Sequence, residues 1–261
     1  MLKTLLLSAL VALAMSTRGT EAAPPVPVIV ELFTSEGCWD CPPADDVLEQ
    51  FVSAQPIGGV EIIGLGEHVD YWDRLGWKDR FSSARLTDRQ QIYQARFNTE
   101  SIYTPQMVVD GRAEFIGSDG KAARSAIKKA LKAPHGVVRL SVGPGARTQG
   151  AVQSIAVTVT ASHLPRLGPG DKADIVVAVT EDHLRSDVKR GENRGRKLTH
   201  AAVVRQMAIV GQASAGGASS ARTEVPLSPD WQRDALKIVA FVQEQRGRAI
   251  LAAAAVKIDG R

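Results

Sequence analysis

The chain contains only two cysteines, and both lie in one Cys-x-x-Cys motif formed by Cys38, Trp39, Asp40 and Cys41. Residues 28–33, just before the motif, form an almost continuous apolar run with β-branched residues, which predicts a buried strand. Apolar residues at helical spacing follow the motif, and the prolines at 42 and 43 suit the first turn of a helix. This order of strand, dithiol and helix suits a redox pair, because two sulfurs at this spacing can close a small ring and a helix N-terminus stabilises a thiolate.

The pattern beyond the motif predicts two regions. The first continues with a strand at 60–65, a helix capped by Thr87 with Gln90 completing a capping box, strands at 106–109 and 114–116 joined by an Asp-Gly turn, and a helix from 118 or 119 to 132. Strands follow at 137–142, 152–160, 174–181, 201–210, 221–227, 236–242 and 250–257. About seven short strands with Gly and Pro turns suggest a β-sandwich, so we place a domain boundary near residue 134.

Composition excludes several classes of protein. Of 261 residues, 44% are hydrophobic and 23% are charged, which is ordinary globular usage. The 32 basic and 28 acidic residues are too balanced to suggest a nucleic-acid-binding protein. Two cysteines exclude a disulfide-rich scaffold and a four-cysteine zinc site. The chain has neither a phosphate-binding Walker loop nor a dinucleotide fingerprint, so we expect no cofactor.

The first 22 residues have the pattern of a secretory signal peptide. Lys3 precedes an apolar run at 5–15, which is too short for a transmembrane helix of ~20 residues. Thr20 and Ala22 supply small residues at positions −3 and −1, so we expect cleavage after Ala22. The mature protein is therefore expected to be exported, periplasmic or secreted, and not membrane-spanning. An oxidising compartment would allow a disulfide.

Pro105 is the second candidate element of the dithiol site. Thr104-Pro105 comes just before the strand predicted at 106–109. In thioredoxin-like folds, a cis proline at this place faces the dithiol and guides the backbone of the substrate. Cis peptide bonds are essentially confined to X-Pro, so the sequence permits one here.

The chain resembles the secreted thioredoxin-like family called "domain of unknown function 1223". The residues that carry the resemblance are Gly37-Cys38 with Cys41-Pro42-Pro43-Ala44-Asp45, His68-Val69-Asp70-Tyr71-Trp72-Asp73 with Leu75-Gly76-Trp77-Lys78-Asp79, Tyr103-Thr104-Pro105-Gln106, and Gly191-Glu192-Asn193-Arg194-Gly195. The resemblance implies an α/β fold, with a thioredoxin-like domain at 23–134 and an all-β, sandwich-like domain at 135–261. It brings no established reaction.

By analogy with thioredoxin-like proteins, Cys38 would be the exposed attacking thiol and Cys41 the buried resolving thiol. Glu31 could exchange a proton with Cys41, or it could be a carboxylate at a strand end that meets water. Negative charge on Asp40 and Glu36 would oppose formation of the thiolate. A purely structural disulfide is the alternative, but its loop is so short that it would remove little entropy from the unfolded chain.

A loop rich in tryptophan and aspartate at 67–81 forms a second candidate cluster. His68 could donate a proton or bind a metal, and Trp72 could form part of an apolar floor for a peptide. Asp70 could take part in the site or only cap a turn. A basic segment at 185–197 is interpreted as a solvated hairpin whose Glu192 and Asn193 bond to its own backbone.

We therefore expect an exported thiol–disulfide oxidoreductase that acts on a partner protein, or on a small thiol, through Cys38, Cys41 and Pro105. One alternative is a module that binds or delivers copper, because two soft sulfurs suit Cu(I). The other alternative is a non-enzymatic binding protein with a structural disulfide.

Overall fold

The computed structural model describes residues 23–147, 153–214 and 216–258. The predicted signal peptide, residues 1–22, lies outside this part. The N-terminal half contains β1 (Val26–Thr34), α1 (Pro42–Ala54), β2 (Val60–His68), the 3-10 helix η1 (Asp73–Leu75), α2 (Ala84–Phe97), β3 (Gln106–Val109), β4 (Ala113–Ile116) and α3 (Gly120–Ala130). This order of strands and helices confirms the one predicted from the sequence. The predicted Asp-Gly turn is also present, with positive φ at both Asp110 and Gly111.

The C-terminal half is built from strands. They are β5 (Val137–Arg147), β6 (Gln153–Ser162), β7 (Ala173–Glu181), β8 (Leu184–Asp187), β9 (Lys197–His200), β10 (Val203–Ala213), β11 (Ser219–Leu227), β12 (Leu236–Glu244) and β13 (Ile250–Lys257), with the 3-10 helix η2 (Arg233–Ala235) before β12. The basic segment 185–197, which the sequence predicts to be a hairpin, forms the turn between β8 and β9 together with the adjoining ends of both strands.

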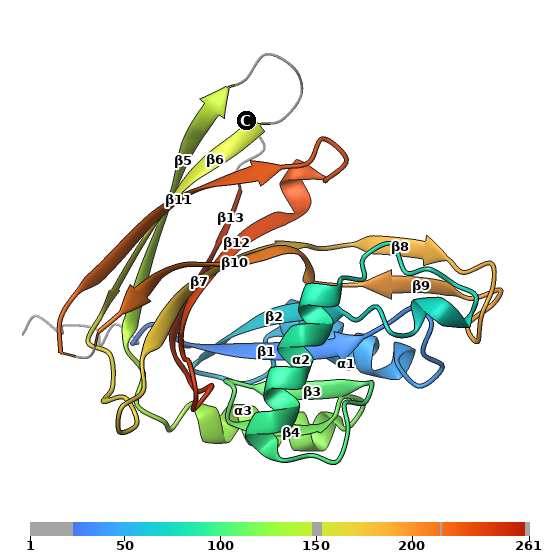
Figure 1. The fold of residues 1–261 in the computed structure, drawn as a ribbon, viewed down its shortest axis with the longest axis horizontal. Coiled ribbons are helices and arrows are strands. Elements are labelled where there is room, and N and C mark those ends of the chain that lie inside the picture. Colours follow the sequence, from blue (N-terminus) through green and yellow to red (C-terminus); the bar gives the residue numbers. More distant parts are fainter. Residues whose placement is uncertain (1–22, 148–152, 215, 259–261) are drawn as a thin grey trace, which may run out of the picture.

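The two halves share one large mixed sheet, so the fold is mixed α/β. Its eight strands run in the order β13-β12-β7-β10-β2-β1-β3-β4 (Figure 1). β1 pairs with β2 in parallel and with β3 antiparallel. The halves join where β10 pairs in parallel with β2, at Val203 and Gly66. The sheet thus continues across the boundary predicted near residue 134.

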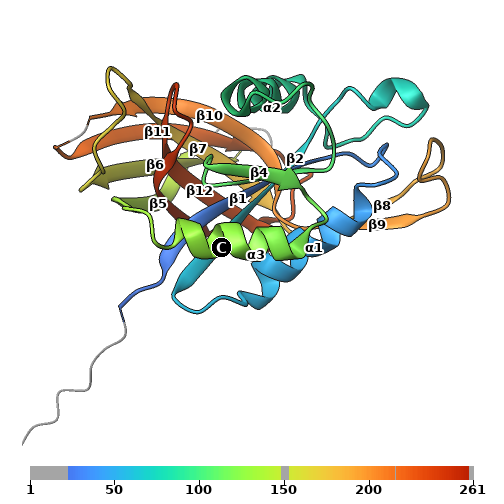
Figure 2. The same cartoon turned by 90° about the horizontal axis from the view of Figure 1, so that it is seen from below.

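The three helices cover the two faces of this sheet unequally. Alternate residues of β1 separate the faces: Val28 and Val30 pack with α1 and α3, whereas Ile29 packs with Leu86 of α2. Figure 2 shows α2 on one side of the sheet and α1 and α3 on the other. A second sheet, β11-β6-β5, packs against β7, β12 and β13. Its side chains meet Ile175 and Val177 of β7, so the sandwich-like layering of the C-terminal half uses the shared sheet as its second layer.

Helix α2 begins earlier than the sequence predicts. Its N-cap is Ser83, whose side chain accepts a hydrogen bond from the backbone N–H of Arg85. Thr87 and Gln90 therefore lie inside the helix and are buried, so the predicted capping box is wrong. Both side chains instead contact the loop after β2. Along the described residues, no helix is long and apolar enough to cross a membrane.

Candidate functional site

Cys38 and Cys41 form a disulfide at the start of α1, with their Cα atoms 5.4 Å apart. The helix begins at Pro42, as predicted, and the carbonyl of Cys41 accepts hydrogen bonds from the N–H groups of Ala44 and Asp45. Cys38 is only 1% exposed and Cys41 is fully buried. The expectation that Cys38 stands exposed is therefore wrong for this oxidised state, because other segments of the chain cover it.

One covering segment is the turn of the β8–β9 hairpin. Asn193 is fully buried, and its Nδ2 donates hydrogen bonds to the carbonyls of Glu36 and Cys38, at 2.9 and 2.8 Å. The carboxylate of Glu192 accepts a hydrogen bond of 3.0 Å from the backbone N–H of Trp39. The interpretation of this segment as a solvated hairpin bonded to itself is corrected here. Its turn binds the backbone of the dithiol loop from the other half of the molecule.

An open cavity of about 440 Å³ adjoins Cys38 and not Cys41. Its lining residues are Cys38, Trp39, Asp40, Trp72, Thr104 and Glu192. Trp39 is 59% exposed at its rim. The Nε1 of Trp72 donates a hydrogen bond of 2.8 Å to Oγ1 of Thr104, and this fixes the two walls against each other. The peptide bond between Thr104 and Pro105 is cis, so the predicted cis proline follows directly after a residue of this wall.

A buried cluster of Glu36, Asp45 and His200 lies beside the disulfide. His200 stands 3.4 Å from Oε1 of Glu36 and 3.6 Å from Oδ2 of Asp45. Burial would lower the pKa of His200, but its contacts with Asp45 and Glu36 outweigh burial and raise the pKa to about 10. His200 is therefore a cation at neutral pH. Its positive charge offsets the negative charge of Glu36, which the sequence analysis expected to oppose formation of a thiolate.

Glu36 and Asp45 have further partners that hold them in place. The Nε1 of Trp77 donates a hydrogen bond of 2.6 Å to Oε2 of Glu36, and the hydroxyl of Thr34 donates one of 2.9 Å to Asp45. Asp45 follows Cys41 by four residues, so the two lie on one side of the helix, a single turn apart. The cluster thus extends along α1 from the end of the dithiol motif.

His68 lies at the end of β2 and joins this cluster from the other side. Its Nδ1 is 2.6 Å from Oδ2 of Asp79, and its ring meets that of His200 with 4.8 Å between centroids. Burial alone would raise the pKa of Asp79. The charge of His68 and the N–H groups of Glu36 and Phe81 outweigh this and lower it to about 2.

The other predicted residues of the loop have separate roles. Asp70 accepts a hydrogen bond of 2.6 Å from the hydroxyl of Thr87, and this fastens the loop to α2. Tyr71 is fastened in the same way, through its hydroxyl, to Gln90. Of the predicted cluster, only Trp72 reaches the cavity beside Cys38, whereas His68 reaches the buried cluster.

Glu31 is not brought to the dithiol. It is fully buried, and its carboxylate is bound by Arg89 and by the hydroxyl of Tyr93. Both partners belong to α2, while Cys41 precedes α1 on the opposite face of the sheet. Glu31 is therefore not placed to exchange a proton with Cys41. The alternative, a carboxylate at a strand end that meets water, is also wrong, because Glu31 is fully buried.

Sequence reasoning missed three residues of the site: Asp45, Asn193 and His200. Asp45 carries a signal, since its spacing from Cys41 places both on one side of the predicted helix. Asn193 and His200 carry none, because only the pairing of β10 with β2 brings their hairpin to α1. Within the described ranges, no group of three or more His, Cys, Asp or Glu side chains is arranged to hold a metal ion.

Comparison with known proteins identifies a family and several similar solved structures. The family described as "Protein of unknown function (DUF1223)" matches residues 29–243. The crystal structure of protein AGR_C_4864 from Agrobacterium tumefaciens is similar, with a TM-score of 0.63 and 27% identity, over 92% of this chain and 98% of that one. HBP35 of Porphyromonas gingivalis has a TM-score of 0.62 and 13% identity, over 92% of this chain and 77% of that one. Among curated proteins, none matches this sequence. The chain belongs to the DUF1223 family.

Proposed function

We propose that this protein is an exported thiol–disulfide oxidoreductase that acts through Cys38 and Cys41. The observation that carries the proposal is the asymmetry of the disulfide: an open cavity adjoins Cys38, while Cys41 is enclosed at the start of α1. A partner sulfur that enters this cavity meets Cys38 first. The cluster of charged groups beside α1 supports the proposal, because perturbed pKa values gather at functional sites.

We also infer that the N-terminal half is thioredoxin-like. Three features support this: the element order from β1 to α3, the dithiol at the N-terminus of α1, and the cis proline before β3. In that fold family the residues beside the cis proline guide an extended substrate. Thr104 would do so here, since it lines the cavity beside Cys38. Export is proposed from the sequence of residues 1–22.

The reaction is an exchange of disulfides in two steps. A partner thiolate attacks Sγ of Cys38, the bond to Cys41 breaks, and Cys41 leaves as a thiolate. A second partner thiolate then attacks the partner sulfur of this mixed disulfide and releases Cys38 as a thiolate. The partner loses two electrons, which the protein's disulfide gains. The reverse sequence reduces a partner disulfide, and the reduction potential of the pair sets the direction.

The buried cluster of Glu36, Asp45 and His200 would help to stabilise the negative charge that forms on Cys41. When Cys41 leaves as a thiolate, the N-terminus of α1 and the cationic His200 both favour the negative charge. Asp45 lies one helical turn from Cys41 and 3.6 Å from His200, so it would hold this cation close to the start of α1.

The partner would be a protein with an exposed thiol or disulfide, or a small thiol. Trp39 and Trp72 offer apolar surface on two sides of Cys38, which suits an extended peptide segment next to a cysteine. Expression of Cys41→Ser and Cys38→Ser in the exporting cell, followed by non-reducing electrophoresis, tests the proposal. We expect partner adducts on Cys41→Ser and none on Cys38→Ser, because only the first keeps the thiol that adjoins the cavity and lacks the resolving thiol.

The burial of both sulfurs favours a second candidate, a binding protein with a structural disulfide. Asn193 then serves only to hold the dithiol loop closed. In that case neither variant forms adducts, and the wild-type protein isolated from cells is always fully oxidised. Adducts on Cys38→Ser alone would instead reverse the roles of the two cysteines.

A further inference from the structure

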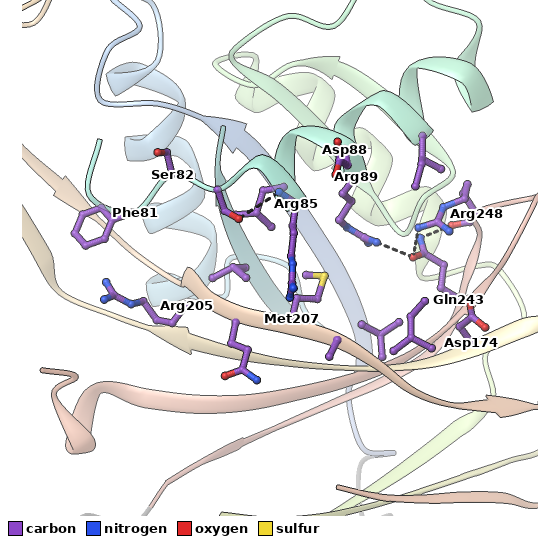
Figure 3. A pocket seen from close by; sticks show the side chains of 18 of the residues that line it. Phe81, Ser82, Arg85, Asp88, Arg89, Asp174, Arg205, Met207, Gln243 and Arg248 are labelled. Atoms are coloured by element: carbon purple, nitrogen blue, oxygen red, sulfur yellow. Dashed lines mark hydrogen bonds between the residues drawn. The ribbon is translucent and has the colours of Figure 1, made fainter. Parts of the chain in front are cut away.

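A second cavity, of about 720 Å³, lies between α2 and the strands β7, β10 and β12 (Figure 3). Its lining shares no residue with the cavity beside Cys38. The reason for the space is architectural. The other face of the shared sheet is covered by α1, α3 and the three-stranded sheet, whereas α2 is the helix on this face (Figure 2). The volume is within the range of small-molecule sites, about 300–1,000 Å³.

The floor of this cavity is the strand β10, which carries an exposed apolar residue. β10 pairs with β2 only at Val203 among the described residues, whereas it pairs with β7 as far as Ala213, so Ile209 lies beyond the junction with β2 and is 65% exposed. Ile92 of α2 lines the same cavity and is 47% exposed. Val176, Val204 and Met207 continue the apolar surface between them. A single exposed isoleucine needs no explanation, but an apolar hollow with two of them is the kind of surface that binds ligands.

The charged residues around this apolar surface are mainly basic. The lining contains Arg80, Arg85, Arg89, Arg205 and Arg248, against Asp88 and Asp174. Arg89 is held by Glu31 and Gln243, and Arg205 lies 3.5 Å from Glu181. The guanidinium of Arg85 forms no hydrogen bond or ion pair within the described part of the chain. Figure 3 shows it extending from α2 across the cavity toward Met207.

The other arginines also have reason to attract an anion. Burial lowers the pKa of Arg205, and the nearby positive charge of Arg80 lowers it further. Burial lowers the pKa of Arg248 as well, and Arg89 adds to the effect. The buried Nε of Arg248 has no hydrogen-bond partner among the described residues.

We propose that this cavity binds an amphipathic carboxylate, an alkyl chain that ends in a carboxylate. The carboxylate would pair with Arg85, because a guanidinium offers two parallel donors to the two oxygens. The alkyl chain would lie along Ile92, Met207 and Ile209 and remove their surface from water. This site is independent of the dithiol and does not rest on the redox proposal.

Isothermal titration calorimetry of the mature, oxidised protein with sodium decanoate tests this site. We expect saturable binding of one decanoate per chain, and none of acetate, which lacks the chain, or of decyltrimethylammonium, which has the opposite charge. Arg85 is exposed, so Arg85→Gln should weaken binding about threefold, the effect of losing one exposed charge pair. Arg74→Gln, in exposed η1 outside the cavity, is the matched control and should leave affinity unchanged.

Three results would overturn the proposal: no saturable binding of decanoate, equal binding of the cationic analogue, or unchanged affinity in Arg85→Gln. Ile209→Ser gives a second test, since it removes apolar surface from an exposed position that folding does not require. This variant should weaken the binding of decanoate and leave the temperature of thermal unfolding nearly unchanged. Sedimentation with phosphatidylglycerol vesicles separates a free ligand from a membrane. Vesicle binding that depends on Arg85, without decanoate binding, would reject a free carboxylate as the occupant.

Discussion

Replacement of His200 by glutamine should change how the stability of the protein depends on pH. His200 is buried between Glu36 and Asp45, and these carboxylates raise its pKa from an ordinary 6.5 to about 10. A group whose pKa is raised by folding stabilises the folded state fully below its unfolded pKa. That contribution is lost as pH rises through the folded pKa. The window for His200 is therefore about pH 6.5 to 10.

The size of the effect follows from the same values. A change from 6.5 to about 10 corresponds to roughly 5 kcal/mol at ~1.4 kcal/mol for each pKa unit. The two carboxylates stand at 3.4 and 3.6 Å, beyond the usual length of an N–H···O hydrogen bond, so the attraction is mainly Coulombic. We therefore expect a smaller contribution, about 2–4 kcal/mol.

The assay is urea unfolding of the oxidised protein at several pH values from 6 to 10. Oxidised cysteines do not titrate, and other groups that titrate in this range cancel when wild type and His200→Gln are compared at each pH. The difference in unfolding free energy should shrink by about 2–4 kcal/mol between pH 6 and pH 10. His163→Gln, at an exposed histidine, is the control, and its difference from wild type should stay constant. A constant difference for His200→Gln would refute the ionic role of His200.

Three further predictions concern the residues around the dithiol. Asn193→Ala removes two hydrogen bonds to buried carbonyls, so it should lower stability by about 2–4 kcal/mol and speed reduction of the disulfide by dithiothreitol, whereas the exposed Arg194→Ala should do neither. Asp79→Asn should cost about 2 kcal/mol near pH 6 and flatten acid unfolding between pH 4 and 2, since the pKa of Asp79 is lowered from 3.8 to about 2 and its stabilisation is lost as pH falls through that value. Glu31→Gln removes one of the two buried carboxylates beside Arg89 and leaves Glu67 at 3.3 Å, so it should cost about 1–3 kcal/mol in urea unfolding. It should leave the rate of dithiothreitol reduction unchanged, and a slower rate would place Glu31 in the thiol chemistry after all.

Local patterns predicted the N-terminal half of the fold well. The order of elements from β1 to α3, the start of α1 at Pro42 and the turn at Asp110 each depend on a few neighbouring residues. The error at α2 has a tertiary cause. Thr87 and Gln90 fit a capping box, but their side chains form hydrogen bonds with Asp70 and Tyr71 in the loop after β2, and Ser83 caps the helix instead.

The residues of the candidate site could be predicted only where the local sequence around them carries the signal. Cys38 and Cys41 follow from their motif, and Pro105 follows from its place just before the strand at 106–109. The burial of Cys38 does not follow from the motif, because Asn193 covers it from a distant hairpin. The partners of Glu31 were equally hidden, since Arg89 and Tyr93 lie on a helix that is far from Glu31 in the sequence. Contacts between remote segments depend on the pairing of strands, which a single sequence does not determine.

The junction of the two halves explains why the dithiol site needs both of them. Gly66 in β2 donates its N–H to the carbonyl of Ala202 at 2.7 Å, and a Cβ on Gly66 would come within 3.1 Å of the carbonyl oxygen of Ala201. Glycine thus permits the close approach that joins β2 to the start of β10. His200 lies two residues before Ala202, so the same junction places it between Glu36 and Asp45. The β8–β9 hairpin, which ends at His200, is held over Cys38 by this geometry. The C-terminal half therefore contributes directly to the dithiol site, because it supplies Asn193 over Cys38 and the cation between Glu36 and Asp45.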